Sequence, residues 1–310
     1  MNASEALAEL VQRATSEVAG IPTGYSVDTR YGMPGAGHLA LVVARSSVGK
    51  STFYLNVVNR SNVVPTVVFN FEMDPGQQWL WLACMSQNMP VSVHELSGVI
   101  RNPDDPRHAD VMNALDLTPD LFPSLHFVKM TKPPTVNELV EEVDVIQEES
   151  GVEIQRVIID HVSLLQGARD YTGMSLTTAA LKAWAQGSRL LVMALQQGGR
   201  SGDATGRNNG HLPVTLGSGV YAGESDADIM YGLYRPGKDP KYAKPEYNGS
   251  PEHERLRNVT RFSVVKNRFG ETDDVGIALH FASYSYRLTE AGVPYVLPEI
   301  PGFPGSNEPF

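Results

Sequence analysis

The sequence predicts an α/β fold, with a mostly parallel central sheet flanked by helices and a C-terminal antiparallel hairpin. The first observation is that continuous runs of Val, Ile and Leu alternate with amphipathic helical stretches between residues 20 and 195. Such alternation is typical of parallel strands that are covered on both faces. The second observation is that the pattern changes after residue 195, where polar stretches at 198–217 and 236–258 are interleaved with late β-type runs. Connections of that length are usually functional or mobile loops.

The strands are expected where short apolar runs, rich in β-branched residues, stop at polar or turn-forming residues. The run at 39–43 is LALVV, the run at 67–71 is VVFNF, and the core of the fourth strand is VII at 157–159. The last run is long enough to fold back on itself as a hairpin. The full set of expected strands is 39–43, 67–71, 125–130, 157–159, 190–195, 229–234, 260–266 and 275–288.

The helices are expected where apolar residues recur three and four positions apart. In the stretch 136–149, Leu139, Val140, Val143 and Ile146 share one face. The helix that follows the second strand is expected to begin at Asp74-Pro75, because Asp and Pro are typical at the N-cap and first helical positions. The expected helices are 50–60, 75–88, 92–98, 108–116, 136–149 and 174–186.

Composition excludes several classes of protein. Of the 310 residues, 42% are hydrophobic and 19% are charged, which is ordinary for a globular chain. The single cysteine, Cys84, excludes an internal disulfide framework and fits a reducing compartment, so we expect the cytoplasm, or the host cytoplasm if the protein is viral. No apolar run reaches the roughly 18 residues that cross a bilayer, and we expect no membrane partner. The net charge of −10 argues against a generally basic surface but permits a local basic site.

We expect three segments along the chain. Residues 1–19 are an amphipathic helical arm, whose apolar side packs on the core of its own subunit or docks on a neighbouring one. Residues 20–290 form one large domain, and residues 291–310, with five prolines and three glycines, form an extended tail. The apolar side of the arm consists of Leu7, Leu10, Val11, Ala14 and Val18.

A phosphate-binding loop lies between the first strand and the first long helix. The motif is a P-loop in which alanine replaces the first glycine. Its chemistry requires backbone N–H groups that face inward, a helix N-terminus aimed at phosphate, and one mobile cation. Lys50 is placed to reach the β- and γ-phosphates of a nucleotide, and Ser51 to bind Mg²⁺ through its hydroxyl. The expected nucleotide-binding residues are Ala44, Arg45, Ser46, Ser47, Val48, Gly49, Lys50, Ser51 and Thr52.

Two further carboxylates are expected at the same sheet edge, because ligands of open α/β sheets lie beyond the carboxyl ends of the strands. Asp160 ends the strand RVIID and is the expected second ligand of Mg²⁺. Glu72 follows the strand VVFNF and is the expected base that activates the attacking water. Asp74 is the competing candidate, although its position before Pro75 favours a helix cap.

Together, these motifs resemble the C-terminal domain of the DnaB-like replicative helicases, a RecA-like P-loop ATPase domain. The resemblance covers roughly residues 20–288, and the motifs stand in the family's order. It begins at GIPTGY (20–25), continues through ARSSVGKSTFYLNVV, VVFNFEM and VIIDHVSLLQG, and includes the stretch 217–229. About 19 residues precede the match, so we expect a stand-alone, phage-type version without the family's N-terminal partner-binding domain or a primase-like segment.

The resemblance also assigns roles to three residues late in the chain. Gln197, in ALQQGGR, takes the position of the glutamine that senses the γ-phosphate, and Lys266 and Arg268 take those of the lysine-x-arginine hairpin. In the family this hairpin projects into the nucleotide site of the neighbouring subunit. Two cations spaced two residues apart on a strand share a face, which suits an arginine finger; alternatively, they are a solvated basic strand edge. A finger supplied by a neighbour implies a homo-oligomer, either a ring such as a hexamer or a filament.

Single-stranded DNA is the partner that the resemblance implies, contacted by the loops at 167–174 and 198–217. Residues 200–270 contain 11 Lys and Arg against 8 Asp and Glu, a local charge of +3, so the rest of the chain carries −13. The expected contacts are to phosphates and carry no base readout. The expected DNA-binding residues are Arg169, Arg200, Arg207, Asn208 and Asn209.

The leading hypothesis is therefore an ATP- and Mg²⁺-dependent helicase or translocase in DNA replication or recombination. A RecA-like strand-pairing protein would use the same ATP chemistry. An ATP-regulated nuclease would need a cluster of carboxylates, for which Glu224, Asp226 and Asp228 are the candidates. The fourth hypothesis is a regulatory ATPase that binds protein rather than DNA.

Overall fold

The computed structural model describes residues 20–87, 89, 91–198, 210–216, 223–282 and 285–291. The predicted arm at 1–19 and the predicted tail beyond Ala291 lie outside these residues. The described helices are α2 (Val27–Tyr31), α3 (Lys50–Arg60), α4 (Pro75–Ser86), α5 (Val93–Arg101), α6 (His108–Leu121), α7 (Val136–Ser150), α8 (Tyr171–Ser188) and α9 (Pro251–Leu256), with 3₁₀ helices η1 (Val162–Leu164), η2 (Pro236–Lys238) and η3 (Pro240–Ala243). The described strands are β1 (Leu39–Ala44), β2 (Thr66–Asn70), β3 (Leu125–Val128), β4 (Arg156–Asp160), β5 (Leu191–Gln197), β6 (Ile229–Tyr234), β7 (Val259–Asn267), β8 (Asp273–Ala282) and β9 (Arg287–Glu290).

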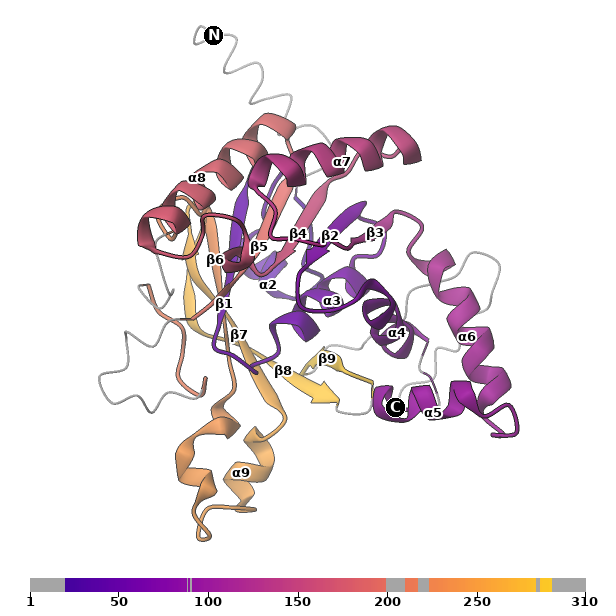
Figure 1. Cartoon of the computed structure of the whole chain (residues 1–310). Helices are drawn as coiled ribbons and strands as arrows, with labels where there is room; N and C mark the ends of the chain where they lie inside the picture. The colour runs from indigo at the N-terminus through magenta and orange to yellow at the C-terminus, as the bar shows by residue number, and fades with distance from the viewer. Residues whose placement is uncertain are drawn as a thin grey trace, which may run out of the picture.

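These strands form a single sheet in the order β3-β2-β4-β5-β1-β6-β7-β8-β9 (Figure 1). The six strands from β3 to β6 are parallel, whereas β7, β8 and β9 are each antiparallel to the preceding strand in the sheet. Parallel neighbours need crossover connections, which the helices supply. The predicted fold class, including the antiparallel C-terminal part, is confirmed.

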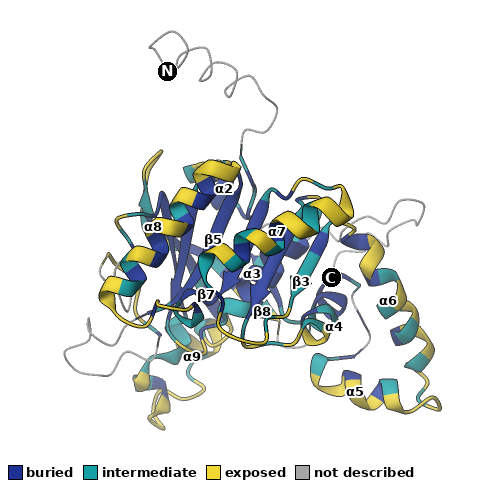
Figure 2. Ribbon diagram, turned by 45° about the horizontal axis from the view of Figure 1, so that its top comes forward, coloured by how far each residue is buried: buried dark blue, intermediate teal, exposed yellow. Residues whose placement is uncertain are grey.

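The two faces of the sheet are covered by different helices. Along β1, Leu39, Leu41 and Val43 contribute to the apolar cluster that includes α7 and α8, while Ala40 and Val42 contribute to the cluster that includes α3. This alternation follows from the two-residue period of a strand. Figure 2 shows the outcome, with buried strands between helices whose outer sides are exposed. All six residues of β1 are buried, so the loop that follows β1 is built on rigid core.

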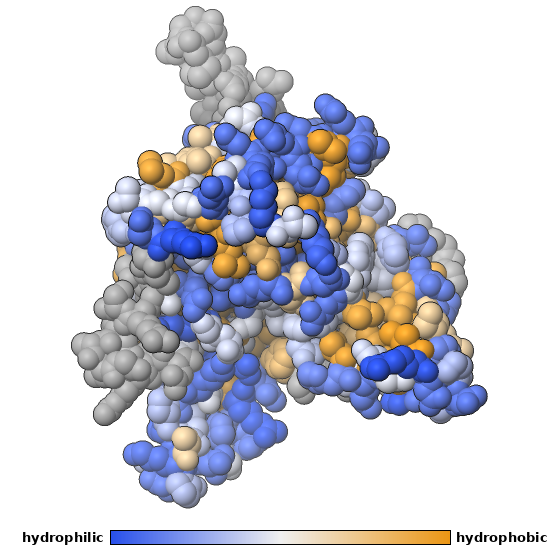
Figure 3. Space-filling view, viewed as in Figure 1, coloured by the Kyte–Doolittle hydropathy of each residue, from blue (hydrophilic) through white to orange (hydrophobic). Residues whose placement is uncertain are grey.

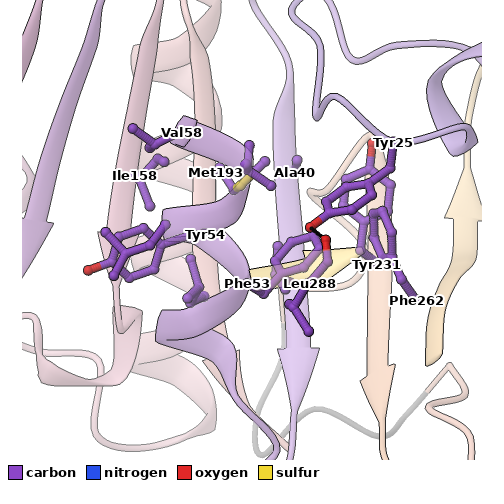
Figure 4. Close-up of a cluster of buried hydrophobic side chains, with 14 of the residues drawn as sticks. Tyr25, Ala40, Phe53, Tyr54, Val58, Ile158, Met193, Tyr231, Phe262 and Leu288 are labelled. Carbon is purple, nitrogen blue, oxygen red and sulfur yellow. Dashed lines mark hydrogen bonds between the residues drawn. The ribbon is translucent and has the colours of Figure 1, made fainter. Parts of the chain in front are cut away.

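Aromatic rings pack between α3 and the late strands (Figure 4). The Phe262 ring of β7 lies 4.7 Å from the Phe53 ring of α3 and 5.0 Å from the Tyr231 ring of β6, measured between centroids. Tyr25, from the segment that precedes α2, stacks at 6.0 Å on Phe53 and donates its hydroxyl to the Leu288 carbonyl over 3.3 Å. Helix α3, which follows the phosphate loop, therefore packs against the late strands of the sheet through these rings.

Helices α4, α5 and α6 form a smaller apolar cluster beside the main core. Its buried members include Cys84 of α4, Leu96 of α5 and Val111 of α6. Figure 3 shows apolar side chains reaching the surface between α4 and the α5–α6 pair. The partly buried residues that pack on this cluster are Leu80, Val93, Ile100, Ala114 and Leu115.

Some predicted boundaries were wrong. Helix α8 begins at Tyr171, not near 174, because the Asp170 side chain accepts a hydrogen bond from the Gly173 N–H over 2.7 Å and caps the helix. Helix α6 continues past 116 to Leu121 and contains Pro119 in its last turn, although a proline at that position removes one backbone hydrogen bond of the helix. The expected strand at 275–288 is two strands, β8 and β9, paired as the predicted hairpin.

The polar stretch 236–258 is not a plain loop, because it contains η2, η3 and α9. Pro236, Pro240 and Pro251 stand at the starts of these three short helices, where the missing N–H is tolerated. In Figure 1 this stretch extends below the sheet from the ends of β6 and β7. None of the helices among the described residues combines the length and the apolar character that crossing a membrane requires.

We predict that Cys84 is inert in the folded protein. Its side chain is buried, and this burial raises the pKa of the thiol to about 11, so at pH 8 only about one molecule in a thousand carries the reactive thiolate. Maleimide labelling at pH 8 should be at least ~100-fold slower in the native than in the denatured protein. Val111→Ala, which opens the same cluster, should speed labelling; rapid labelling of the native wild type would contradict the packing of α4 on α5 and α6.

Candidate nucleotide site

The loop between β1 and α3 has the geometry of a phosphate cradle. It leaves the buried strand at Ala44 and enters the helix at Lys50, as predicted. Ser47 and Gly49 have φ values of 60° and 107°, so the loop turns sharply twice within three residues. Alternating left- and right-handed backbone of this kind turns successive N–H groups toward one concavity. Gly49 is also the N-cap of the 11-residue α3, which adds the positive end of a helix dipole.

Asp160 lies directly against the first turn of α3. The Ser51 hydroxyl donates to Asp160 Oδ2 over 2.6 Å. The carboxylate is buried; burial raises its pKa, while the hydrogen bond from Ser51 and the charge of Lys50 lower it. Its other oxygen, Oδ1, is buried and has no hydrogen-bond partner among the described residues.

The pair formed by Ser51 and Asp160 fits a Mg²⁺ site. Mg²⁺ prefers oxygen ligands and is usually held by one or two protein groups together with substrate phosphates. The hydroxyl oxygen of Ser51 and the unpartnered Oδ1 of Asp160 are the donor types required, next to a loop shaped for phosphate. A half-buried lysine beside them, Lys50, has a pKa that burial lowers and that the charges of Asp160 and Glu72 raise.

Glu72 lies at the same edge of the sheet. Strand β2 ends at Asn70, which is paired in register with Asp160, and Glu72 follows two residues later. Its carboxylate is 55% exposed, and Oε1 lies 3.4 Å from His161 Nε2. The other ring nitrogen of His161 is 2.6 Å from the Ser163 hydroxyl. Burial lowers the pKa of His161, and the negative charge of Glu72 opposes this shift.

The competing carboxylate, Asp74, is a helix cap. Its side chain accepts from the Gly76 N–H over 2.9 Å and pairs with Lys129 over 2.8 Å, outside the site. The expected N-cap at Asp74 is confirmed, which leaves Glu72 as the candidate for the base.

Gln197 is the last residue of β5 and is paired in register with Ala44. Its side-chain nitrogen donates to the Ser46 hydroxyl within the phosphate loop. The next residue, Gly198, donates its N–H to the Ala44 carbonyl over 2.8 Å. The structure thus brings together Lys50, Ser51, Asp160, Glu72 and Gln197, which the sequence places at four separate strand ends.

Lys266 and Arg268 lie at the opposite edge of the sheet. Strand β7 is antiparallel to β6, so Asn267 is paired with Ile229 at the start of β6, whereas Ala44 is paired with Leu233 near its end. Four residue steps along β6 separate the two positions, which is about 13 Å. Both cations contact the segment before β6, since Lys266 Nζ donates to the Glu224 carbonyl, and Arg268 donates to the Ser225 carbonyl and to Asp228 Oδ1. Strand β7 ends at Asn267, so Arg268 lies just beyond it, and both cations contact the same segment, 224–228. The hydrogen bonds and ion pairs described for these two side chains do not include the phosphate loop.

The expected DNA contacts are mostly beyond what the structure describes. Arg169 is exposed, in the turn before α8. Four of the five predicted residues lie outside the described ranges, namely Arg200, Arg207, Asn208 and Asn209. Gly210, the first described residue after these positions, lies against the phosphate loop, since a Cβ at Gly210 would lie 2.5 Å from Val48 Cγ2.

The acidic residues considered for a nuclease site already have protein partners. Asp226 accepts from the Thr178 hydroxyl over 2.7 Å, and Asp228 binds Lys182 over 2.6 Å and the Leu39 N–H over 2.8 Å. Among the described residues, no three or more His, Cys, Asp and Glu side chains are grouped as metal ligands.

Sequence reasoning missed two contacts of the site. Asn70 bonds both Asp160 and the turn that carries Glu72. Lys238, from η2, donates its Nζ to the Ser47 carbonyl of the phosphate loop. Burial lowers the pKa of Lys238, and the nearby Arg235 lowers it further. No sequence motif marks Lys238, because a fold contact across 191 residues brings it to the loop. The only signal for Asn70 was its place at the end of a β run.

A phosphate loop between a buried strand and a helix, with a buried carboxylate two strands away, defines the chain as a RecA-like P-loop domain. More narrowly, it belongs to the DnaB-like helicase C-terminal domain family, whose model matches residues 20–289.

The relatives and solved structures agree with this assignment. The replicative DNA helicase DnaB of Geobacillus stearothermophilus and the replicative DNA helicase DnaC of Bacillus subtilis are each 26% identical, covering 92% of this chain and 61% of their own length. A DnaB-like replicative helicase studied with its interactions with primase has a TM-score of 0.71 and covers 93% of this chain and 66% of its own. A second solved structure, of an ATPase domain alone, has a TM-score of 0.72 and covers 93% and 98%; both structures are 19% identical and show the fold.

We predict that Lys238→Met weakens the binding of a fluorescent ADP analogue about fivefold, because a partly exposed charge-assisted hydrogen bond contributes about 1 kcal/mol. The lost bond is the one that Lys238 donates to the carbonyl of Ser47, a residue with a left-handed backbone. Lys241→Met is the matched control, since Lys241 Nζ pairs with Glu252 over 3.2 Å within the same stretch. If both variants bind the ADP analogue with equal affinity in a titration, the contact between Lys238 of η2 and the phosphate loop does not contribute to nucleotide binding.

Proposed function

We propose that the chain is a Mg²⁺-dependent ATPase that acts on single-stranded DNA as part of an oligomeric ring, with a hexamer as the expected state. The observation that carries this proposal is the meeting of Lys50, Ser51, Asp160, Glu72 and Gln197 at one edge of the sheet. The family membership and the named helicase relatives support the choice of ATP and DNA.

Each of these site residues has a different role in ATP hydrolysis. The N–H groups of residues 45–50 and the ammonium of Lys50 hold the β- and γ-phosphates. Glu72 is half exposed at the mouth of the site, where its carboxylate takes a proton from the attacking water. Mg²⁺, when bound by Ser51 and Asp160, neutralises charge on the phosphate oxygens. Gln197 joins the phosphate loop to the stretch that follows β5, and it transmits the state of the γ-phosphate to that stretch.

The position of Lys266 and Arg268 supports a site that is shared between subunits. Along the sheet they are about 13 Å from the end of the strand that leads into their own phosphate loop, and the Arg268 side chain is 44% exposed. In a ring, that edge of one subunit faces the phosphate loop of the next, so the two cations complete the neighbour's site and stabilise charge on the transferred phosphoryl group.

The local charge of +3 over residues 200–270 supports binding to nucleic acid. The residues proposed to contact DNA phosphates are Arg169, Arg200, Arg207, Asn208 and Asn209, which belong to the stretches that follow β4 and β5. A strand-pairing filament would use the same ATP site, and electron microscopy of closed rings against helical filaments separates the two assemblies. No observation favours a nuclease.

We predict that single-stranded DNA raises the steady-state rate of ATP hydrolysis, because Gln197 contacts the phosphate loop and directly precedes the stretch that is proposed to bind DNA.

The variant Glu72→Gln should keep its affinity for ADP and lose turnover about 100-fold or more, as expected when a general base is removed. Lys50→Ala should lose nucleotide binding itself. A rate that is indifferent to DNA would contradict the DNA part of the proposal, and full turnover by Glu72→Gln would contradict the assigned base.

We further predict that inactive Lys50→Ala and Arg268→Ala proteins partly restore ATPase activity when mixed. Each variant keeps the half of the site that the other has lost, so mixed oligomers contain some complete sites. Lys50→Ala mixed with Glu72→Gln is the matched control and should recover nothing, because both changes damage the same half. Mixed oligomers without activity in the first pair would contradict a finger supplied by the neighbour.

A further inference from the structure

A buried chain of polar side chains lies beneath the nucleotide site. It consists of Asn70 at the end of β2, Tyr54 in α3 and Gln78 in α4, all of which are buried. The Tyr54 hydroxyl donates to Gln78 Oε1 over 2.6 Å and accepts from Asn70 Nδ2 over 2.8 Å. Figure 4 shows the Tyr54 ring leaving α3 on the side away from Phe53, with its hydroxyl turned out of the apolar cluster. Three elements around the site therefore meet at one hydroxyl group.

Asn70 connects this chain to both carboxylates of the site. Its Nδ2 also donates to Asp160 Oδ2 over 3.2 Å. Its Oδ1 accepts from the N–H groups of Glu72 and Met73, each over 2.8 Å. The backbone adds a further tie, since the Phe71 N–H donates to the Asp160 carbonyl over 3.0 Å. One side chain thus touches the proposed metal carboxylate and the turn that carries the proposed base.

The directions of these hydrogen bonds fix how the amide is oriented. Tyr54 gives its only proton to Gln78, so its oxygen can only accept from Asn70. The amide nitrogen of Asn70 must then face Tyr54 and Asp160, and its oxygen must face the turn at Glu72 and Met73. With Oδ2 of Asp160 bonded to both Ser51 and Asn70, the remaining oxygen, Oδ1, is the one that is buried without a hydrogen-bond partner.

We propose that Asn70 is a positioning residue for ATP hydrolysis, which holds the Asp160 carboxylate and the Glu72 turn in one fixed arrangement through its amide. This inference rests on the proposed Mg²⁺-dependent ATPase activity. Asparagine meets the requirement because a single planar group supplies two donors and an acceptor. Partners that orient metal-binding carboxylates in this way typically change metal affinity or activity by about 10- to 100-fold when they are removed.

Asn56 provides a matched control. It is also buried, and it makes the same kinds of bond: Nδ2 donates to the Thr52 and Tyr286 carbonyls over 2.8 and 3.0 Å, and Oδ1 accepts from the Leu288 N–H over 2.9 Å. None of these partners is a site carboxylate. Asn56→Leu and Asn70→Leu therefore both remove a buried amide of the same size, and only the second releases Asp160 and the Glu72 turn.

The test measures the affinity of a fluorescent ADP analogue with Mg²⁺ and with EDTA, together with the melting temperature and the steady-state kinetics. Asn70→Leu should reduce the Mg²⁺-dependent gain in ADP affinity about tenfold, and should lower kcat by a larger factor than it changes KM. Asn56→Leu should lower the melting temperature while keeping both the Mg²⁺ gain and kcat. Tyr54→Phe, a milder change, should shift the Mg²⁺ gain in the same direction and should have little further effect when combined with Asn70→Leu.

The possible failures are distinguishable. If Asn70→Leu lowers the melting temperature but keeps the wild-type Mg²⁺ gain and kcat, Asn70 is only structural and the inference is wrong. The same holds if Asn56→Leu reduces the Mg²⁺ gain equally. If the wild-type protein itself binds the ADP analogue equally well in Mg²⁺ and in EDTA, the proposed function fails, and the inference fails with it.

Discussion

The hydrogen bond between Ser51 and Asp160 is the contact on which the rest of the site depends. It joins the first turn of α3 to the end of β4 over 2.6 Å, although β5 lies between β4 and β1 in the sheet. The bond is possible because the parallel register brings the carboxyl ends of β1, β2, β4 and β5 to one edge. Any slip in this register would separate the phosphate loop from its carboxylates. The strand register, which the core packing fixes, therefore determines the relative positions of the site side chains.

The opposite charges of Asp160 and Lys50 explain how the protein tolerates buried charge at this edge. Burial raises the pKa of Asp160 and lowers the pKa of Lys50, and each group's charge opposes the shift of the other. Charges that are already in place in a partly buried site need little rearrangement when a ligand binds, which is the usual basis of electrostatic catalysis. Asn70 and Gln197 extend this fixed arrangement to the Glu72 turn and to Ser46. The site therefore forms only when the ends of these strands come together in the folded sheet, and no single sequence motif contains all of its residues.

Much of this could be predicted from sequence, and the exceptions have physical causes. The strands were predictable because buried parallel strands are continuous apolar runs, as at β1 and β4. The positions of Lys50, Ser51, Asp160 and Glu72 were predictable because each lies at the end of such a run or in the turn that follows it. Asn70 and Lys238 were not, because their roles come from contacts with residues 90 and 191 positions away. The short helices in 236–258 were missed because their prolines suggest a loop until each is seen to begin a helix.

The central claim is that each nucleotide site is completed by a neighbouring subunit. Its most direct test is a cryo-electron microscopy structure of the protein assembled with single-stranded DNA, Mg²⁺ and a non-hydrolysable ATP analogue. The account predicts that Arg268 leaves Asp228 of its own chain and lies within hydrogen-bond distance of the γ-phosphate bound by Lys50 of the adjacent subunit. Filled sites in which Arg268 remains on its own Asp228, with no cation from the adjacent subunit near the γ-phosphate, would contradict it.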